Sequence, residues 1–121
     1  MQNQLQTHIA AIAALKTSIV ETFSAHYDLP FDGSAVQTDI YLALYYYWEL
    51  KAKRVSRTLQ IIRSRGLLEA VDELVSRDHN SHGFDAFSAN GQLDRTFEHV
   101  VMCHPTWFSD KARLRATARM M

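Results

Sequence analysis

Apolar residues recur at helical intervals along almost the whole chain. In the first segment they stand three, four or seven positions apart, with Lys16 at the skipped position: Leu5, Ile9, Ile12, Ile19 and Phe23. This spacing places the side chains on one face of a helix of about 24 residues. A proline and a glycine within residues 28–34 then end the helix, because proline disfavours helical geometry in the residue before it and glycine permits a turn.

The second apolar series is the longest in the chain. Its members follow one another at steps of three or four: Tyr41, Leu44, Trp48, Ala52, Val55, Leu59 and Ile62. Gly66 follows as a natural C-terminal cap. We therefore predict one helix from about Ala35 to Arg65, about 45 Å long at about 1.5 Å per residue.

Shorter apolar series predict the remaining elements. We expect a third helix from Leu67 to about Arg77, with its acidic residues outward, and a polar, glycine-containing loop over residues 78–91. A fourth helix should run from about Gln92 to Cys103 and end before a proline.

The last predicted helix begins after Ser109, a suitable N-cap, and extends through Arg119. Since the apolar spacing is helical nearly throughout, and four glycines and two prolines are too few for a β-rich fold with many turns, the sequence predicts an all-α fold. We expect a single domain over residues 1–121, built as a compact bundle of four to five helices around one long central helix, about 35–65.

Composition narrows the class of protein. With 121 residues, 47% of them hydrophobic and 21% charged, the chain resembles an ordinary globular domain that can bury a core without staples. A single cysteine, Cys103, cannot form an internal disulfide, which is typical of a reducing compartment. The start of the sequence has no signal-peptide pattern, and no apolar run is long enough to span a bilayer. These features predict a cytoplasmic protein with no membrane partner.

Charge is sorted along the chain although it cancels overall. The 13 basic and 13 acidic residues give net charges of −3 over residues 1–48, +5 over 49–66, −6 over 67–110 and +4 over 111–121. The basic block directly follows an aromatic run, Tyr45 to Trp48. A basic block beside aromatic residues favours contact with a polyanion or an acidic partner.

On the predicted long helix, the basic residues and two tyrosines lie opposite the apolar arc. Arginine binds phosphate through paired hydrogen bonds, and tyrosine offers a surface on which bases stack. The predicted nucleic-acid-binding residues are Lys51, Lys53, Arg54, Arg57, Arg65, Tyr46 and Tyr47. Our first hypothesis is a non-enzymatic accessory protein that binds nucleic acid within a larger nucleoprotein assembly and needs no cofactor.

Two other interpretations of this face stay open. The protein could be an inhibitor or adaptor that uses this face to bind an acidic protein surface. It could then form a homo- or hetero-oligomer. Alternatively, its arginines pair within the chain with Glu69, Asp72 or Glu73 of the next helix. The sequence does not distinguish DNA, RNA and protein as partners.

Metal and catalytic sites receive little support from the sequence. The spacings His79-x2-His82 and His99-x3-Cys103 suit zinc, but they are also those of solvated loop histidines and a small apolar cysteine, so we predict no metal site. Residues 77–82 resemble the Arg-x4-His motif of the HEPN ribonucleases, which are small helical domains. That resemblance covers six residues and implies that Arg77 and His82 act on RNA phosphate across a dimer. The chain lacks a glycine-rich phosphate loop, a GxSxG motif and clustered carboxylates, so we predict no enzymatic activity.

Overall fold

The computed structural model describes residues 2–52 and 55–121, with only the backbone for residues 2–4. Within these ranges the chain forms seven α-helices and two short 3-10 helices and no strand, which confirms the all-α class. The helices are α1 (Gln2–His26), α2 (Ala35–Leu50), α3 (Ser56–Arg65), α4 (Leu67–Ser76), α5 (His82–Ala89), η1 (Leu93–Arg95), α6 (Phe97–Cys103), η2 (Pro105–Trp107) and α7 (Asp110–Met120). Over the described ranges, no helix has both the length and the apolar character needed to cross a bilayer.

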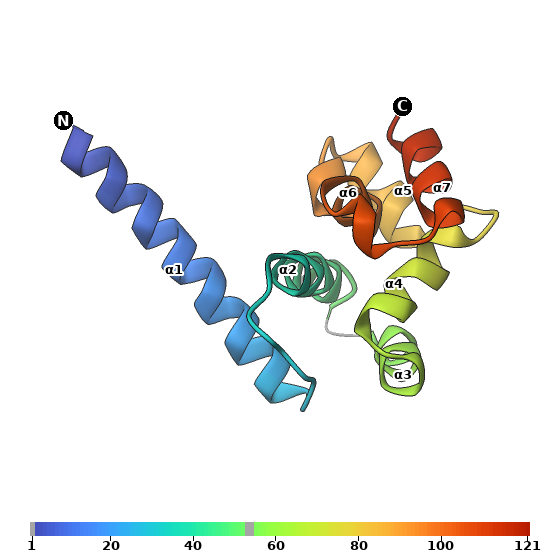
Figure 1. Cartoon of the computed structure of the whole chain (residues 1–121), viewed down its shortest axis with the longest axis horizontal. Helices are drawn as coiled ribbons and strands as arrows, with labels where there is room; N and C mark the ends of the chain where they lie inside the picture. Colours follow the sequence, from blue (N-terminus) through green and yellow to red (C-terminus); the bar gives the residue numbers. More distant parts are fainter. Residues whose placement is uncertain (1, 53–54) are drawn as a thin grey trace.

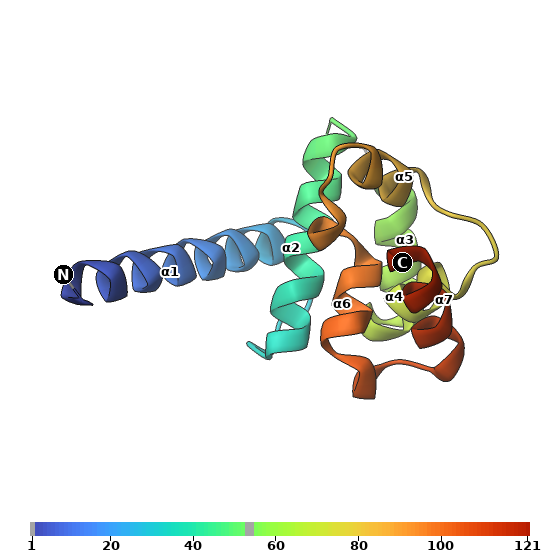
Figure 2. The ribbon, with the colours of Figure 1, turned by 90° about the horizontal axis from the view of Figure 1, so that it is seen from above.

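Helix α1 stands apart from the rest of the molecule. It projects from α2 as a rod, and its N-terminal end lies far from the other helices (Figure 1 and Figure 2). Its C-terminal turns pack on α2, where Val20 and Phe23 are buried. The predicted apolar stripe therefore runs along the whole helix, but the domain covers only its C-terminal end.

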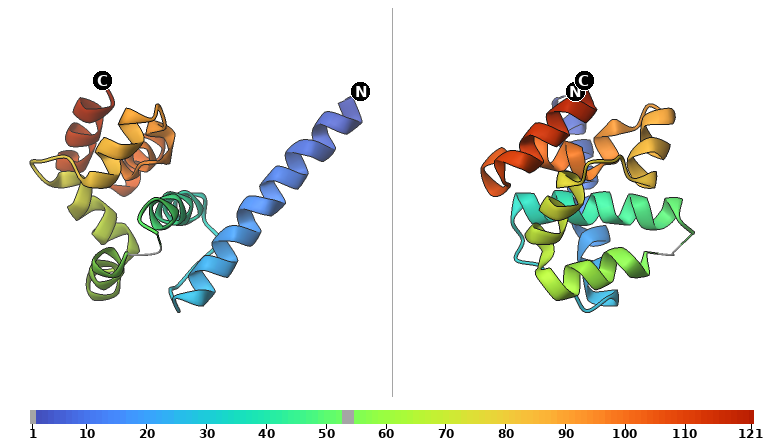
Figure 3. Two further views of the ribbon diagram at one scale, coloured as in Figure 1. Left: turned by 180° about the vertical axis from the view of Figure 1, so that it is seen from behind. Right: turned by 90° about the vertical axis from the view of Figure 1, so that its right-hand side faces the viewer.

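The predicted single helix from 35 to 65 is wrong: α2 and α3 are separate helices (Figure 3). Helix α2 ends at Leu50, and Ala52 follows in the left-handed backbone region with φ of 52°. The sequence concealed this turn, because no glycine or proline marks it and the apolar steps continue across it. They continue because both helices bury a face: Leu44 belongs to one and Leu59 to the other.

The predicted loop over residues 78–91 contains a short helix, α5. Ser81 caps it, since the Ser81 hydroxyl accepts a hydrogen bond from the Phe84 N–H at 3.0 Å. Phe84 and Phe87, three positions apart, are buried beneath the helix. Polar and glycine residues around these two aromatics masked the helical spacing.

The predicted helix over residues 92–103 is divided at Thr96. The Thr96 hydroxyl accepts from the His99 N–H at 3.1 Å and so starts α6 after the separate turn η1. The helix predicted from Leu67 is confirmed as α4, and the helix predicted after Ser109 is confirmed as α7, with the Ser109 hydroxyl accepting from the Ala112 N–H.

The core lies on the side of α2 that faces away from α1, toward α4, α6 and α7 (Figure 1). Its centre is formed by side chains with 0% or 1% exposure, from four helices: Ile40, Tyr41 and Leu44 of α2, Val71 and Val75 of α4, Val101 of α6, and Ala112 and Ala116 of α7. Small alanines on α7 let that helix approach α4 and α6 closely. Helix α2 thus separates the packed helices from the projecting α1.

Candidate interaction surfaces

The two tyrosines of the predicted nucleic-acid face are engaged inside the domain. Tyr47 packs against Gly83 of α5 so closely that a Cβ atom added to the glycine would lie 2.8 Å from the tyrosine ring. Burial raises the pKa of Tyr47. The guanidinium carbon of Arg95 lies 4.4 Å from the centroid of the Tyr46 ring and covers one ring face. Stacking of bases on both rings would therefore require these contacts to open.

The described basic residues of that face do not lie on one helix. Because the long helix is broken, Lys51 lies at the end of α2, whereas Arg57 and Arg65 lie on α3. Arg57 is exposed, and Lys53 and Arg54 lie outside the described residues. Arg65 Nε lies 2.8 Å from Glu73 Oε2, an ion pair without hydrogen-bond geometry. One of the pairings that the sequence left open, Arg65 with an acidic residue of the following helix, is thus present.

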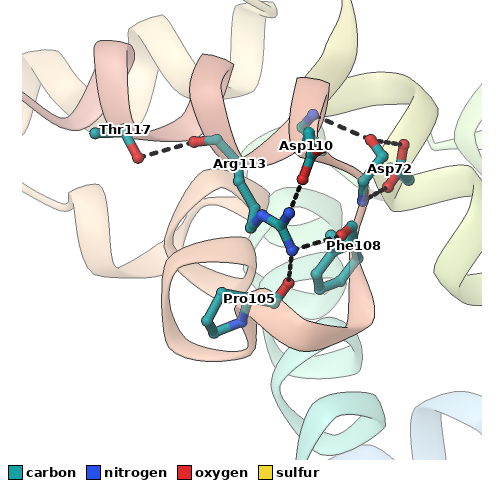
Figure 4. Close-up of polar contacts among 8 residues, drawn as sticks. Asp72, Pro105, Phe108, Asp110, Arg113 and Thr117 are labelled. Carbon is teal, nitrogen blue, oxygen red and sulfur yellow. Dashed lines mark hydrogen bonds and ion pairs between the residues drawn. The ribbon is translucent and has the colours of Figure 1, made fainter.

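Three of the four basic residues of α7 bind neighbouring elements. Arg113 donates to the carbonyl oxygens of Pro105 and Phe108, at 3.0 and 3.2 Å, and pairs with Asp110 (Figure 4). Arg115 pairs with Asp78 at 2.5 Å. Arg119 donates to the carbonyl oxygens of Val75, Arg77 and His79. These guanidinium groups fix α7 to the preceding segments.

An acidic residue of α4 completes this attachment. The Asp72 carboxylate accepts hydrogen bonds from both the backbone N–H and the hydroxyl of Ser109, at 2.6 and 2.9 Å (Figure 4). The acidic and basic blocks that the sequence separates thus meet across the fold.

Of the four residues with zinc-like spacing, His99 and Cys103 contact one another, and His79 and His82 are exposed; His104, outside that set, contacts an aspartate. Cys103 Sγ lies 3.4 Å from His99 Nε2, and His104 Nε2 lies 2.6 Å from Asp39 Oδ2. Desolvation and the Asp39 carboxylate raise the pKa of Cys103, which favours the protonated thiol. Among the residues whose positions are given, no group of three or more His, Cys, Asp or Glu side chains is arranged to hold a metal.

The Arg-x4-His pattern is divided between two elements. Arg77 is the C-terminal cap of α4, and its carbonyl oxygen accepts from Arg119. His82 is the first residue of α5 and is exposed. The two residues therefore lie on opposite sides of the connection between α4 and α5.

The projecting part of α1 carries a series of exposed apolar side chains. Every residue from 5 to 18 is exposed. Four large apolar side chains in this segment have exposed fractions between 48% and 64%: Leu5, Ile9, Ile12 and Leu15. We call these four residues the α1 stripe. Lys16 is the one charged side chain among residues 2–20, so the surroundings of the stripe are nearly uncharged.

A groove with a volume of about 510 Å³ adjoins the stripe where α1 meets α2. We call it the aromatic groove; its lining residues are Ser18, Ile19, Thr22, Phe23, His26, Tyr27, Tyr45 and Trp48. Trp48 stacks on Tyr45 at 5.8 Å between ring centroids and meets Phe23 edge-on, also at 5.8 Å. The Trp48 N–H donates to the Tyr27 hydroxyl at 2.6 Å. These contacts hold the walls of the groove in a fixed shape.

Sequence reasoning placed Leu5, Ile9 and Ile12 on one apolar face of a helix but did not include Leu15 and did not predict that this face is exposed. Periodicity alone carries no signal for this, because it does not specify which part of an apolar face the other helices cover.

A second cavity, of about 70 Å³, encloses an acidic side chain that sequence reasoning missed. Glu98 lines it with Tyr47 and Arg119, and only 5% of the residue is exposed. Burial raises the pKa of Glu98, and the charge of Arg119 partly opposes this effect. This carboxyl group therefore costs free energy when it is ionised in the folded protein.

We compared the chain with known proteins, and no family model, no curated protein and no solved structure matches it. Function must therefore be inferred from the surfaces themselves.

Proposed function

We propose that the protein is a non-enzymatic protein-interaction module that binds an apolar helical surface of a polypeptide through the α1 stripe and the aromatic groove. The observation that carries this proposal is the exposure of four large apolar side chains on one projecting helix. Exposed apolar patches of this kind mark sites of interaction, because association removes their apolar surface from water, which is favourable.

Energetics support an interaction of useful strength. Full burial of a Leu or Ile side chain stabilises by about 1.5–3 kcal/mol. The four residues of the stripe are each about half to two-thirds exposed, so a partner can still bury much of that surface. A helix laid into an apolar groove is a recurring mode of peptide recognition and uses anchors at this spacing.

The nearly uncharged character of residues 2–20 favours a polypeptide partner at this site. Binding to phosphate backbones needs several Lys or Arg residues, and a helix on an anionic membrane surface has a polar face rich in them. Lys16 alone does not supply such a face.

The nucleic-acid hypothesis has weaker support. It rests on Lys51 and Arg57 and on residues 53 and 54, which lie outside the described ranges. Arg65 faces Glu73, and Tyr46 and Tyr47 pack against Arg95 and Gly83. We treat binding to nucleic acid as an alternative outcome of the test.

Photo-crosslinking in the source cells tests the proposal. A photoreactive amino acid is placed at Ile12, within the stripe, or at Ala14, about 200° around the helix. We expect the Ile12 chain to form polypeptide adducts that the Ala14 chain does not form. Equal labelling at both positions, or none, would contradict the proposal. Binding of oligonucleotides with an affinity that falls log-linearly with salt would then favour the polyanion hypothesis.

A further inference from the structure

We propose that the partner of the α1 stripe is a second copy of this chain, paired so that two α1 helices run antiparallel and each stripe occupies the other copy's aromatic groove. This inference rests on the proposed function and specifies its partner.

The stripe and the groove lie on the same side of α1. At about 100° per residue, the four residues of the stripe fall within an arc of about 120°, from Leu15 to Ile9. Ile19 and His26, which line the groove, fall within the same arc. One partner helix can therefore follow the stripe and enter the groove without changing sides.

A two-fold axis uses both surfaces of each copy at once. The stripe lies toward the N-terminal end of α1 and the groove toward its C-terminal end. When two copies of α1 run antiparallel, each stripe lies opposite a groove, and one interface contains two equivalent contacts. In a parallel pair each stripe would face the other stripe, and both grooves would stay open.

The size of the surface suits a dimer that forms as concentration rises. The stripe supplies four residues and the groove eight from each copy. Standard protein interfaces use about 20–30 residues on each side, so this pairing should depend on concentration.

Charge also favours a second copy over a charged partner. Residues 2–20 contain no acidic residue, and Lys16 is their one basic residue. Lys16 lies on the same side of α1, at the skipped position of the apolar series, and lines a cavity with Asp39 and Asp94 of the same chain. A nearly uncharged apolar surface is complementary to itself and offers nothing that selects an acidic or basic protein.

Sedimentation of the purified full-length chain tests the pairing. We expect the mass to rise from 13.9 kDa toward twice that value with increasing concentration. Ile12→Asp in the stripe and Thr22→Arg in the groove should each weaken the dimer at least tenfold. Both residues are exposed, so the helical circular dichroism should be unchanged. Ala14→Asp, with the same added charge on the opposite side of α1, should leave the dimer intact.

Disulfide trapping tests the direction, with Cys103 replaced by Ser. A mixture of Leu5→Cys and Thr22→Cys chains should form the mixed disulfide, because antiparallel pairing brings these positions together. Leu5→Cys chains alone should not crosslink. Rapid crosslinking of Leu5→Cys chains alone would overturn the antiparallel arrangement.

A mass of 13.9 kDa at all concentrations, or a dimer that neither Ile12→Asp nor Thr22→Arg weakens, would overturn the inference. The proposed function fails separately. If the chain is monomeric but the Ile12 photo-crosslinker still captures another polypeptide specifically, the homodimer is wrong and the interaction module stands. If it captures none, both are wrong.

Discussion

The N-terminal part of α1 and the central part of α2 have the same apolar spacing and opposite surroundings. Leu5, Ile9 and Ile12 follow one another at steps of four and three, as Tyr41, Leu44 and Trp48 follow at steps of three and four. Tyr41 and Leu44 are 0% exposed, whereas the α1 residues are about half exposed or more. The comparison shows that helical periodicity identifies a face that needs covering but does not identify what covers it.

The largest expected loss of stability is in the buried part of α2. Leu44→Ala removes a fully buried side chain from the core and should lower the free energy of unfolding by about 2–5 kcal/mol. Chemical denaturation followed by circular dichroism measures the change. A loss below about 1 kcal/mol would mean that the core closes around the missing atoms and that burial in α2 differs little from exposure in α1.

A smaller effect is expected where α2 meets α5. Gly83→Ala places a methyl group 2.8 Å from the Tyr47 ring, so either α5 or the ring must move. We expect a loss of about 1–3 kcal/mol, typical of overpacking. The double variant with Tyr47→Ala should lose less than the sum of the two single changes, because the clash disappears. Additive losses would show that Tyr47 does not pack on Gly83.

Glu98 differs from both groups of residues, since it is buried like the core of α2 but carries an ionisable carboxyl group. Its pKa in the folded protein is raised above the ordinary value of 4.5, so the protonated form is favoured at low pH and that advantage is lost as the pH rises through the folded-state pKa. Glu98→Gln should therefore raise the thermal midpoint at pH 7, because the neutral amide avoids the cost of burying a charge. The difference between variant and parent should shrink as the pH falls toward 4.5. A destabilised variant at pH 7 would show that attraction to Arg119 outweighs the cost of burial.

The smallest effect is expected at the exposed end. Leu15→Ala removes the same atoms as Leu44→Ala from a residue that is 62% exposed. In dilute solution its unfolding free energy should change by no more than about 0.5 kcal/mol. Denaturation of the variant and the parent at several protein concentrations measures this change. The variant should lose more unfolding free energy at concentrations where the parent chain associates. A large loss at the lowest concentration would mean that the stripe is covered within one chain.

Local signals in the sequence predicted part of the fold well. Two helix ends were predicted from single capping residues, and both are confirmed. Gly66 ends α3, and Ser109 begins α7. The sequence did not predict the turn at Ala52, because alanine is not typical of the left-handed backbone region that it adopts there. It did not predict helix α5, because the two buried phenylalanines of that helix stand among polar residues.

The candidate site was harder to predict because its use depends on contacts between distant segments. The sequence identified the basic block, but the partner of Arg65 and the cation above Tyr46 come from α4 and η1. The sequence predicted an apolar face from Leu5 to Phe23, which includes three of the four residues of the stripe. Its exposure depends on where the later helices lie, which periodicity does not specify.

The projection of α1 also affects how the chain folds. Isolated helices shorter than about 12–15 residues are marginal in water, and residues 5–18 are all exposed, so tertiary packing adds little to their intrinsic helix propensity. Four alanines in this segment favour the helix, and the packed turn at Val20 and Phe23 supplies a nucleus from which it extends. The local opening free energy should therefore fall from the packed turns toward the N-terminal end. Amide hydrogens along α1 should exchange in that order, and association should slow their exchange.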